Sequence, residues 1–177
     1  MKLIVAFCAS RGIGFKNALP WRLKADMDRF QKLTIGNKNN AVIMGKNTWN
    51  SLPYKYKPLP KRENVVVTRN ILKSRSLTRP WIFGSLPLAK DFCNETKFDD
   101  VWMIGGGALY ATALDAGIVE SIYATRIYND YECDVFFPDI PSNFALHDES
   151  DLLREGEIRY KFEIWKNTSK HNTTVIE

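Results

Sequence analysis

Asp26 is the side chain whose place in the sequence most needs a chemical explanation. In the helix predicted over residues 23–34, successive residues turn by about 100°, so Asp26 falls inside an arc of mainly apolar side chains. That arc contains Leu23, Met27, Phe30, Leu33 and Thr34. A carboxylate on such a face is costly unless it has a partner. The partner is either a nearby backbone group or arginine, or a cationic or amidine-like ligand, which would lower a pKa that burial raises.

Two glycine turns offer a different chemistry, the binding of an anion by backbone N–H groups. Gly105-Gly106-Gly107 lies between an apolar run and a predicted helix, and Gly45 lies in the same position after Met44. Glycine lets a ligand approach the backbone, and a helix N-terminus attracts an anion such as a pyrophosphate. Neither turn has the G-x-G-x-x-G pattern, and each could be a simple tight turn. Together they favour a dinucleotide held across the C-terminal ends of a sheet.

Two cations stand beside predicted strand ends and could select the cofactor. Lys46 follows Gly45 and precedes Asn47-Thr48, while Arg69 follows Val67-Thr68. Together they could bind the phosphate that NADPH has and NADH lacks. Either cation alone would more often be ordinary surface charge.

Composition narrows the class of protein. The 177 residues are 45% hydrophobic and suit one globular domain over 1–177. The net charge of +5 comes from scattered lysines and arginines, so a small anionic ligand explains it without nucleic acid as a main partner. Cys8, Cys93 and Cys133 are widely spaced and the two histidines lie near the C-terminus, so neither a disulfide nor a metal site is predicted.

The elements that must position these residues alternate along the chain. Strands are predicted over residues 3–9, 41–44, 64–68, 81–83, 101–104, 121–127 and 159–165, and helices over 23–34, 48–52, 85–93 and 108–116. The alternation predicts an α/β domain with a central mixed, mostly parallel sheet flanked by helices. The last strand should be an antiparallel addition, and 167–177 a frayed polar tail.

No segment of the sequence predicts a membrane or export signal. The apolar run 3–9 is too short to span a bilayer and lacks a small-residue cleavage site, so it suits a buried strand. We therefore expect a cytoplasmic protein, and a monomer, since no exposed apolar stripe argues otherwise.

Taken in order, the motifs resemble the dihydrofolate reductase family over nearly the whole chain. The first half carries Leu3-Ile4-Val5-Ala6, Gly12-Ile13-Gly14, Leu19-Pro20-Trp21, Asp26, Phe30, the segment 44–52 and Pro58-Leu59-Pro60-Lys61-Arg62. The second half carries Ile104-Gly105-Gly106-Gly107, Thr125-Arg126-Ile127, the segment 134–139 and Tyr160-Lys161-Phe162-Glu163. The ordered set is far more specific than any one motif.

Details of the resemblance indicate a place within the family. The loop 52–59 is similar to eukaryotic members, whereas Asp26 stands where vertebrate members carry Glu and bacterial, protist and some invertebrate ones carry Asp. Ala108 stands where some bacterial members have an arginine on the cofactor phosphate, which leaves that contact to Lys46 and Arg69. No thymidylate synthase domain is expected, so the resemblance is to the monofunctional type.

The resemblance implies an activity and a site. The activity is hydride transfer from NADPH to C6 of 7,8-dihydrofolate with protonation at N5, which gives tetrahydrofolate for one-carbon metabolism and thymidylate synthesis. Asp26, Trp21 and Thr125 would form the catalytic set, with Asp26 holding the pterin ring and a water near Trp21 completing the proton path. Arg62 would pair with the glutamate tail of the substrate, and antifolate inhibitors would bind the same site.

The site residues that the resemblance implies fall into two sets. Those for substrate are Ile4, Val5, Ala6, Asp26, Met27, Phe30, Ser51, Leu52, Leu59, Arg62, Ile104, Tyr110 and Thr125. Those for cofactor are Ala6, Ile13, Gly14, Leu19, Gly45, Lys46, Asn47, Thr48, Val67, Thr68, Arg69, Gly105, Gly106, Gly107, Ala108, Leu109 and Tyr110. A lid over residues 10–19, with a turn at Lys16-Asn17, and a cis peptide bond at Gly105-Gly106 are also implied.

Two other functions remain possible on the sequence. A reductase of the same fold that acts on a pyrimidine intermediate of riboflavin synthesis would share the glycine turn but lack the Pro-Trp…Asp…Phe arrangement. A folate-binding or RNA-binding protein without activity could keep the fold. An assay of NADPH oxidation with dihydrofolate separates these alternatives.

Overall fold

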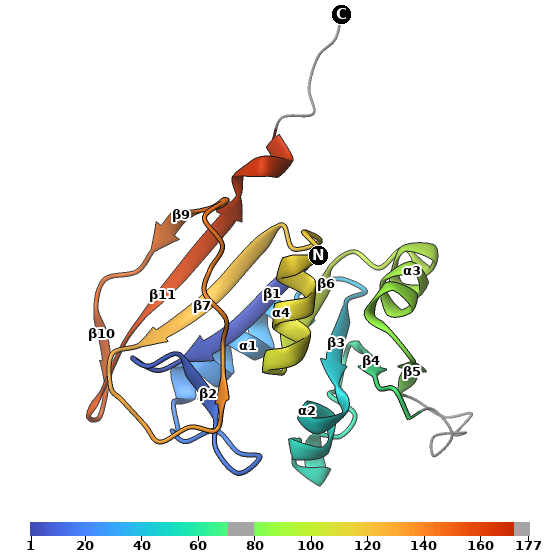
Figure 1. Cartoon of the computed structure of the whole chain (residues 1–177). Helices are drawn as coiled ribbons and strands as arrows, with labels where there is room; N and C mark the ends of the chain where they lie inside the picture. The colour runs from blue at the N-terminus through green and yellow to red at the C-terminus, as the bar shows by residue number, and fades with distance from the viewer. Residues whose placement is uncertain (71–79, 172–177) are drawn as a thin grey trace, which may run out of the picture.

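A twisted sheet forms the centre of the computed structural model, which describes residues 1–70 and 80–171. Within this part the strand order is β10-β11-β7-β1-β6-β3-β4-β5, and β9 pairs with β11 on the same edge as β10 (Figure 1). The parallel strands are β1 (Lys2–Phe7), β3 (Ala41–Gly45), β4 (Glu63–Val67), β5 (Trp81–Phe83), β6 (Val101–Gly105) and β7 (Ser121–Ile127). The antiparallel strands are β9 (Phe144–Glu149), β10 (Leu153–Glu155) and β11 (Ile158–Asn167). The mixed, mostly parallel sheet predicted from the sequence is confirmed.

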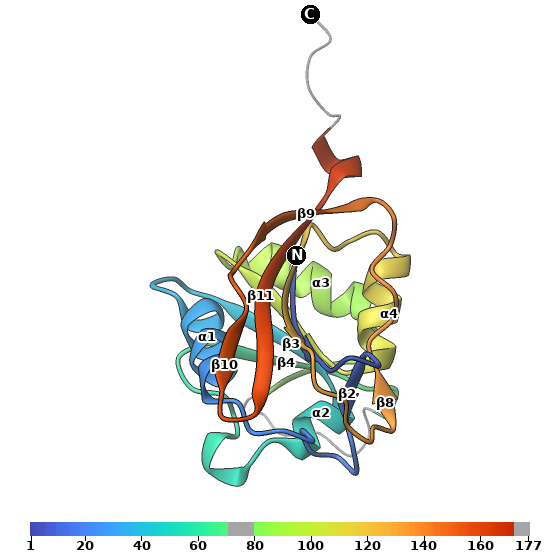
Figure 2. The same ribbon diagram turned by 90° about the vertical axis from the view of Figure 1, so that its left-hand side faces the viewer.

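The apolar runs of the sequence become central strands because both faces of the sheet are covered. In β1, Leu3 and Val5 pack into the core beneath α3 (Leu86–Thr96) and α4 (Gly107–Asp115), while Ile4 packs into the core beneath α1 (Lys24–Ile35) and α2 (Lys46–Ser51). This is the alternation expected of a strand. The sheet therefore separates α1 from α3 and α4 (Figure 2).

Helix ends differ from the predicted ones by a few residues, for identifiable reasons. Ser85 is the N-cap of α3 and accepts a bond from the Leu88 N–H at 3.5 Å, so the helix starts one residue later than predicted. It then continues to Thr96, where Lys97 takes the left-handed conformation at φ 57°. Helix α2 begins at Lys46, directly after β3, rather than at residue 48. A short 3-10 helix η1 (Tyr54–Tyr56) follows it.

Several short strands were not predicted. Strands β2 (Gly12–Gly14) and β8 (Val135–Phe136) form a small antiparallel sheet, and β9 and β10 extend the C-terminal edge. They have two to six residues, and β8 and most of β9 are exposed, so no apolar alternation reveals them. At the end of the chain, the tail predicted to be frayed from Asn167 begins with regular structure. Strand β11 includes the buried Asn167, the 3-10 helix η3 (Thr168–His171) follows, and 172–177 lie outside the described residues.

The parallel strands bring the site to one edge of the sheet. In register, Met44 of β3 lies opposite Gly105 of β6, and Gly45 lies opposite Val67 of β4. On the other side of β6, Ala6 of β1 lies opposite Thr125 of β7. The C-terminal ends of these strands therefore collect the glycine turns and Thr125 at the same edge.

Candidate active site

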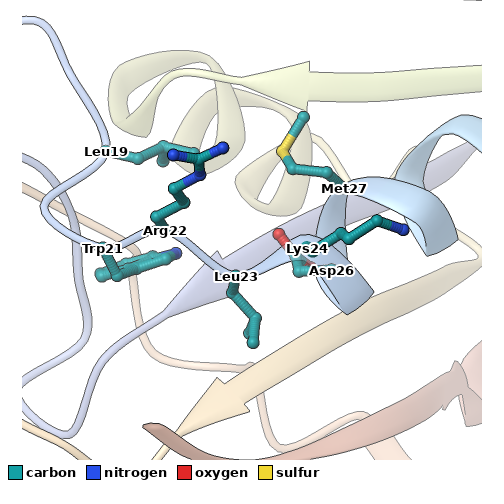
Figure 3. A pocket seen from close by; sticks show the side chains of 7 residues that line it. All are labelled: Leu19, Trp21, Arg22, Leu23, Lys24, Asp26 and Met27. Atoms are coloured by element: carbon teal, nitrogen blue, oxygen red, sulfur yellow. The ribbon is translucent and has the colours of Figure 1, made fainter. Parts of the chain in front are cut away.

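A pocket of about 420 Å³ opens beside the first turn of α1. Leu19, Trp21, Arg22, Leu23, Lys24, Asp26 and Met27 line it. Figure 3 shows these side chains arriving from the segment before the helix and from the helix itself. Asp26 is the carboxylate among them, so the acidic residue that the helical pattern singled out lies in a pocket.

The start of α1 is fixed by a carboxylate distant in the sequence. Glu155 of β10 accepts bonds from the backbone N–H groups of Lys24, at 2.7 Å, and Ala25, at 3.0 Å. The preceding residue, Leu23, has no side chain that could cap the helix. Glu155 thus satisfies N–H groups that a helix start leaves open, and Asp26 is free for other partners.

Asp26 faces the sheet and is bound to it. The Thr125 hydroxyl on β7 donates to Asp26 Oδ1 at 2.6 Å. Burial raises the pKa of the Asp26 carboxyl, while the Thr125 bond and the charge of Arg29 act to lower it. A carboxyl held between these opposing effects can bind a protonated or amide-like ligand edge and respond to its charge. The structure therefore joins Asp26 and Thr125 as the resemblance implied.

Trp21 supplies a hydrogen-bond donor next to this carboxylate. Its side chain is only 7% exposed, and its ring packs against Tyr131 with centroids 5.4 Å apart. Its buried indole Nε1–H has no acceptor among the described residues. Buried donors are normally satisfied, so an unpaired one in a pocket wall marks a place for a ligand or a water.

The helix that lines the pocket also contributes to a hydrophobic cluster, which is called the apolar slot below. Phe30, Leu52, Leu59, Ile104 and Ile4 belong to one hydrophobic cluster, although they come from five different segments. Met27 lies at the rim and is 48% exposed. Such a slot suits a flat aromatic ligand.

Other residues expected at the substrate lie behind or beside the slot. Val5 packs into the core on the opposite face of the sheet, and Ala6 packs near Trp21. Tyr110 is also buried on that opposite face, and its hydroxyl donates to the Ile4 carbonyl at 2.7 Å. The same hydroxyl lies at the Gly105 turn, where it would be 3.3 Å from a Cβ added to Gly105. Ser51 is exposed and donates to the backbone carbonyl of Thr48 at 2.8 Å.

Arg62 lies over the Phe30 ring, with its guanidinium carbon 5.6 Å from the ring centroid. Its Nε donates to the Pro60 carbonyl at 3.0 Å, and its Nη1 donates to the Thr34 hydroxyl. Burial lowers its pKa to about 10, so it remains a cation at neutral pH. These bonds hold a positive charge beside an apolar ring of the slot, which suits an anionic tail on an aromatic ligand.

The glycine turns form the other half of the site. A Cβ on Gly45 would lie 3.8 Å from both the Gly105 carbonyl and the Gly106 nitrogen, so the two turns are in contact. Helices α2 and α4 start here, and neither has a side-chain cap. The implied cis bond between Gly105 and Gly106 is present, with φ +122° at Gly105. The backbone N–H groups of two helix starts, neither bound by a side-chain cap, therefore lie close together.

The remaining residues expected to bind the cofactor lie in α2, α4 and β2 and at the end of β4. Lys46 and Asn47 are exposed at the start of α2. Val67 ends β4, Thr68 follows it, and Arg69 beyond them is exposed. Ala108 and Leu109 are in the first turn of α4. Ile13 and Gly14 are in β2.

The loop over residues 10–19 has the turn that the sequence predicted. Lys16 and Asn17 both have positive φ, of 49° and 63°, and Phe15 pairs with Ala18 across them. Asp134 accepts a bond from the Lys16 N–H at 2.9 Å, which ties the loop to the segment before β8. Leu19, at the end of the loop, is 49% exposed and lines the pocket. The loop thus borders the Asp26 pocket, and Asp134 ties it to β8, the strand that lies against Gly107.

The residues fit a dinucleotide cofactor. Gly106 leaves room beside the Thr48 hydroxyl, which would lie 3.2 Å from an added Cβ, and the uncapped start of α4 offers N–H donors to a pyrophosphate. Lys46 and Arg69 add positive charge at the neighbouring strand ends. A bound phosphate group would find both donors and cations there.

Sequence reasoning missed two residues that shape the site, Glu155 and Arg29. Glu155 is 131 positions from Lys24, and no local pattern links them. Arg29 could have been found, because it lies three residues after Asp26 and such pairs are neighbours on a helix. Among the described residues, no cluster of three or more His, Cys, Asp or Glu side chains is placed to hold a metal ion. None of the described helices is both long and apolar enough to cross a bilayer.

Comparison with known proteins identifies the class to which this fold and site belong. The family model of dihydrofolate reductase matches residues 1–167, and the chain belongs to this family. Similar proteins include the dihydrofolate reductases of Aedes albopictus, 35% identical over 95% of this chain and 97% of the relative, and of Heliothis virescens, 37% identical over 94% and 96%. The dihydrofolate reductase of Gallus gallus is 37% identical over 93% of this chain and 95% of its own length.

Proposed function

We propose that the chain reduces 7,8-dihydrofolate to tetrahydrofolate with NADPH. The observation that carries this proposal is Asp26, which sits in a pocket and is held at 2.6 Å by the hydroxyl of Thr125, on the sheet edge that also carries the glycine turns. The family match and the names of the relatives support the same reaction. The reduced nicotinamide supplies a hydride to C6 of the substrate.

Asp26 binds the pterin ring and sets its charge. Its free carboxylate oxygen accepts from the N–H groups of the pterin edge, and this favours the protonated ring that the hydride reduces. Thr125 keeps the other oxygen, Oδ1, in place. The Trp21 Nε1–H has no protein acceptor among the described residues, so it can hold the water that delivers a proton toward N5.

The slot and Arg62 bind the rest of the substrate. Phe30, Leu52 and Leu59 pack on the aromatic part of dihydrofolate, and the Arg62 guanidinium pairs with the carboxylate of its glutamate tail. A planar guanidinium matches a carboxylate with two parallel bonds. Antifolates, which are also flat and basic at the pterin end, bind in the same slot.

The preference for NADPH over NADH rests on Lys46 and Arg69. Both are exposed cations next to the glycine turns, where the extra phosphate of NADPH can reach them. We expect a higher kcat/KM with NADPH than with NADH in the same assay. Equal values with both cofactors would contradict this part of the proposal.

The activity is tested by following NADPH absorbance with dihydrofolate, in wild type and in Asp26→Asn. We expect the variant to lose at least ~10²-fold in turnover at neutral pH, the scale of a lost acid–base contribution. The loss should shrink at low pH, where the solution protonates the substrate without help from the enzyme.

The matched control is Asp28→Asn. Asp28 lies on the same helix but is exposed and pairs with Lys24. It should keep wild-type turnover. No oxidation of NADPH by the folded wild-type protein would refute the proposed function, and full activity in Asp26→Asn would refute the role of Asp26.

A further inference from the structure

Arg29 is a partly buried cation that the activity described above does not use. It lies on α1, three residues after Asp26, and reaches across to β7 and β11. Its Nη1 donates to the Ala124 carbonyl at 3.0 Å, and its Nη2 is 3.5 Å from the Glu163 carbonyl. The guanidinium also lies over the Phe162 ring, 4.5 Å from its centroid. Backbone acceptors and an aromatic face thus fix its position.

The same guanidinium reaches the residue that binds Asp26. Arg29 Nη1 lies 3.4 Å from Thr125 Oγ1, and that hydroxyl is 2.6 Å from Asp26 Oδ1. A guanidinium can only donate, so the Thr125 oxygen accepts from it, and the Thr125 proton is left to point at Asp26. The chain of donors therefore runs from Arg29 through Thr125 to Asp26. Every hydrogen bond in this chain can form only when Asp26 Oδ1 carries no proton and accepts from Thr125.

We propose that Arg29 is a positioning residue, which fixes the Thr125 hydroxyl as a donor and keeps the Asp26 carboxylate ionised in the substrate-free protein. Its consequence for catalysis rests on the proposed function, but the ionisation of Asp26 does not. Burial favours the neutral form of this carboxyl, because it raises the pKa, and the effects of Thr125 and Arg29 oppose that rise.

Arg22 lines the same pocket, but Arg29 and not Arg22 is the cation that lowers the pKa of Asp26. The other titratable groups around Asp26 do not supply this charge either. Tyr110 on α4 and Tyr160 on β11 both sense the Asp26 charge, and burial raises the pKa of each, so both are neutral at pH 7. Glu155 on β10 is an anion bound to the start of α1, where Lys24 is paired with Asp28 on the exposed face.

The nearest ionised groups of β7 and β11 satisfy each other. The Glu163 carboxylate pairs with Arg126 at 2.6 Å. The Arg29 guanidinium contacts the backbone carbonyl of Glu163, not its carboxylate. Arg29 is the cation whose charge lowers the pKa of Asp26 in the described part of the chain. The lowering of the Asp26 pKa by a positive charge is therefore assigned to Arg29.

The first test measures Asp26 directly. The carboxyl carbon of Asp26 is titrated by NMR in the substrate-free protein, in wild type and in Arg29→Met. We expect the midpoint to rise by about one pH unit when the nearby opposite charge is removed. Arg29→Gln keeps an N–H donor without the charge and should show most of the rise, whereas Arg29→Lys should restore part of the wild-type value.

Two further variants show whether the effect is specific. Lys32→Met removes an exposed cation from the same helix and should leave the Asp26 midpoint unchanged. Thr125→Val should also raise the midpoint, and adding Arg29→Met to it should raise it by less than the sum of the two single effects, since the residues act through one chain of bonds.

The pH dependence of kcat/KM gives the second readout. Its midpoint should move in the same direction in Arg29→Met and Arg29→Gln, and it should return toward wild type in Arg29→Lys. An unchanged Asp26 midpoint in folded Arg29→Met or Arg29→Gln would overturn the proposal. If wild type failed to reduce dihydrofolate, the proposed function would fall, while the NMR titration would still decide the role of Arg29.

Discussion

The two halves of the active site are built from different parts of the chain. The half that contains Asp26 is made of side chains: Thr125 binds the carboxylate, Trp21 presents a donor, and Arg62 lies over the ring of Phe30. The half that contains the glycine turns is made of backbone, with two helix starts in contact and no side-chain caps.

This difference determines how each half responds to mutation. A side-chain contact can be removed or weakened one group at a time, and its chemistry changes with pH. A backbone surface keeps its N–H donors whatever the side chains are. It is altered mainly by substitutions that add atoms where there is no space for them. We therefore expect steric changes to have large effects in the glycine half, and charge changes to have graded effects in the Asp26 half.

Gly107→Ala should have the largest effect on stability. A Cβ there would lie 2.7 Å from the Phe136 carbonyl of β8 and 3.1 Å from a Val135 methyl. Because the closest atom is backbone, the small β2–β8 sheet or the start of α4 must shift. We expect a loss of about 1–3 kcal/mol in the free energy of unfolding, measured with urea, and weaker binding of NADPH.

Gly45→Ala is the matched control in the neighbouring turn. Its Cβ would make ordinary contacts at 3.8 Å, and φ at Gly45 is −75°, which alanine adopts freely. We expect its stability to stay close to that of wild type. Equal losses in the two variants would show that glycine is needed in both turns for a reason other than space.

The two halves also differ in how far the sequence predicted them. The glycine turns are local patterns of a few residues, and the parallel sheet that joins them follows from the alternation of apolar runs and helices. Asp26 was found because its helical arc is local too. Its partner Thr125 is 99 positions away and was assigned through the family resemblance alone.

What local patterns could not supply are the contacts that depend on the folded sheet. Glu155 caps α1 from β10, and β8 is two exposed residues whose pairing with β2 is set by tertiary structure. Tyr110 packs its ring into one core and brings its hydroxyl to the Gly105 turn, and both contacts depend on how α4 lies on the sheet. Long-range hydrogen bonds and faces of burial are fixed only when the elements pack.

Arg62→Leu should have a graded effect confined to the substrate. Loss of a charge-assisted pair of hydrogen bonds to the glutamate tail should raise the KM for dihydrofolate by roughly 10-fold to 100-fold. The value of kcat should change little, because the contact is far from the reacting atoms. Arg62→Lys should lie between, since it keeps the charge and loses the planar fork.

A dihydropterin without the glutamate tail is the control substrate for this prediction. It cannot use Arg62, so its KM should be the same in wild type and in Arg62→Leu. A fall in kcat with unchanged KM for dihydrofolate would place Arg62 near the chemistry rather than at the tail. A fall in stability would instead point to its bonds with Thr34 and Pro60.

The effect of Asp26→Asn on stability should be small, a gain that grows with pH. Burial raises the pKa of Asp26 in the folded protein above its ordinary value of 3.8. Its contribution to stability is therefore fully present below about pH 3.8 and is lost as the pH rises through the folded-state pKa. Asparagine stays neutral and can still accept from Thr125, so the variant avoids this loss. The difference in Tm between variant and wild type, measured from pH 4 to pH 8, should become more positive.

Asp28→Asn separates this effect from a general loss of negative charge. Asp28 is exposed and paired with Lys24, so its removal should not produce a gain that grows with pH. A Tm difference for Asp26→Asn that is flat or negative across the range would mean that Thr125 and Arg29 outweigh burial. In that case the ionised Asp26, with its Thr125 and Arg29 partners, would stabilise the folded protein instead of lowering its stability.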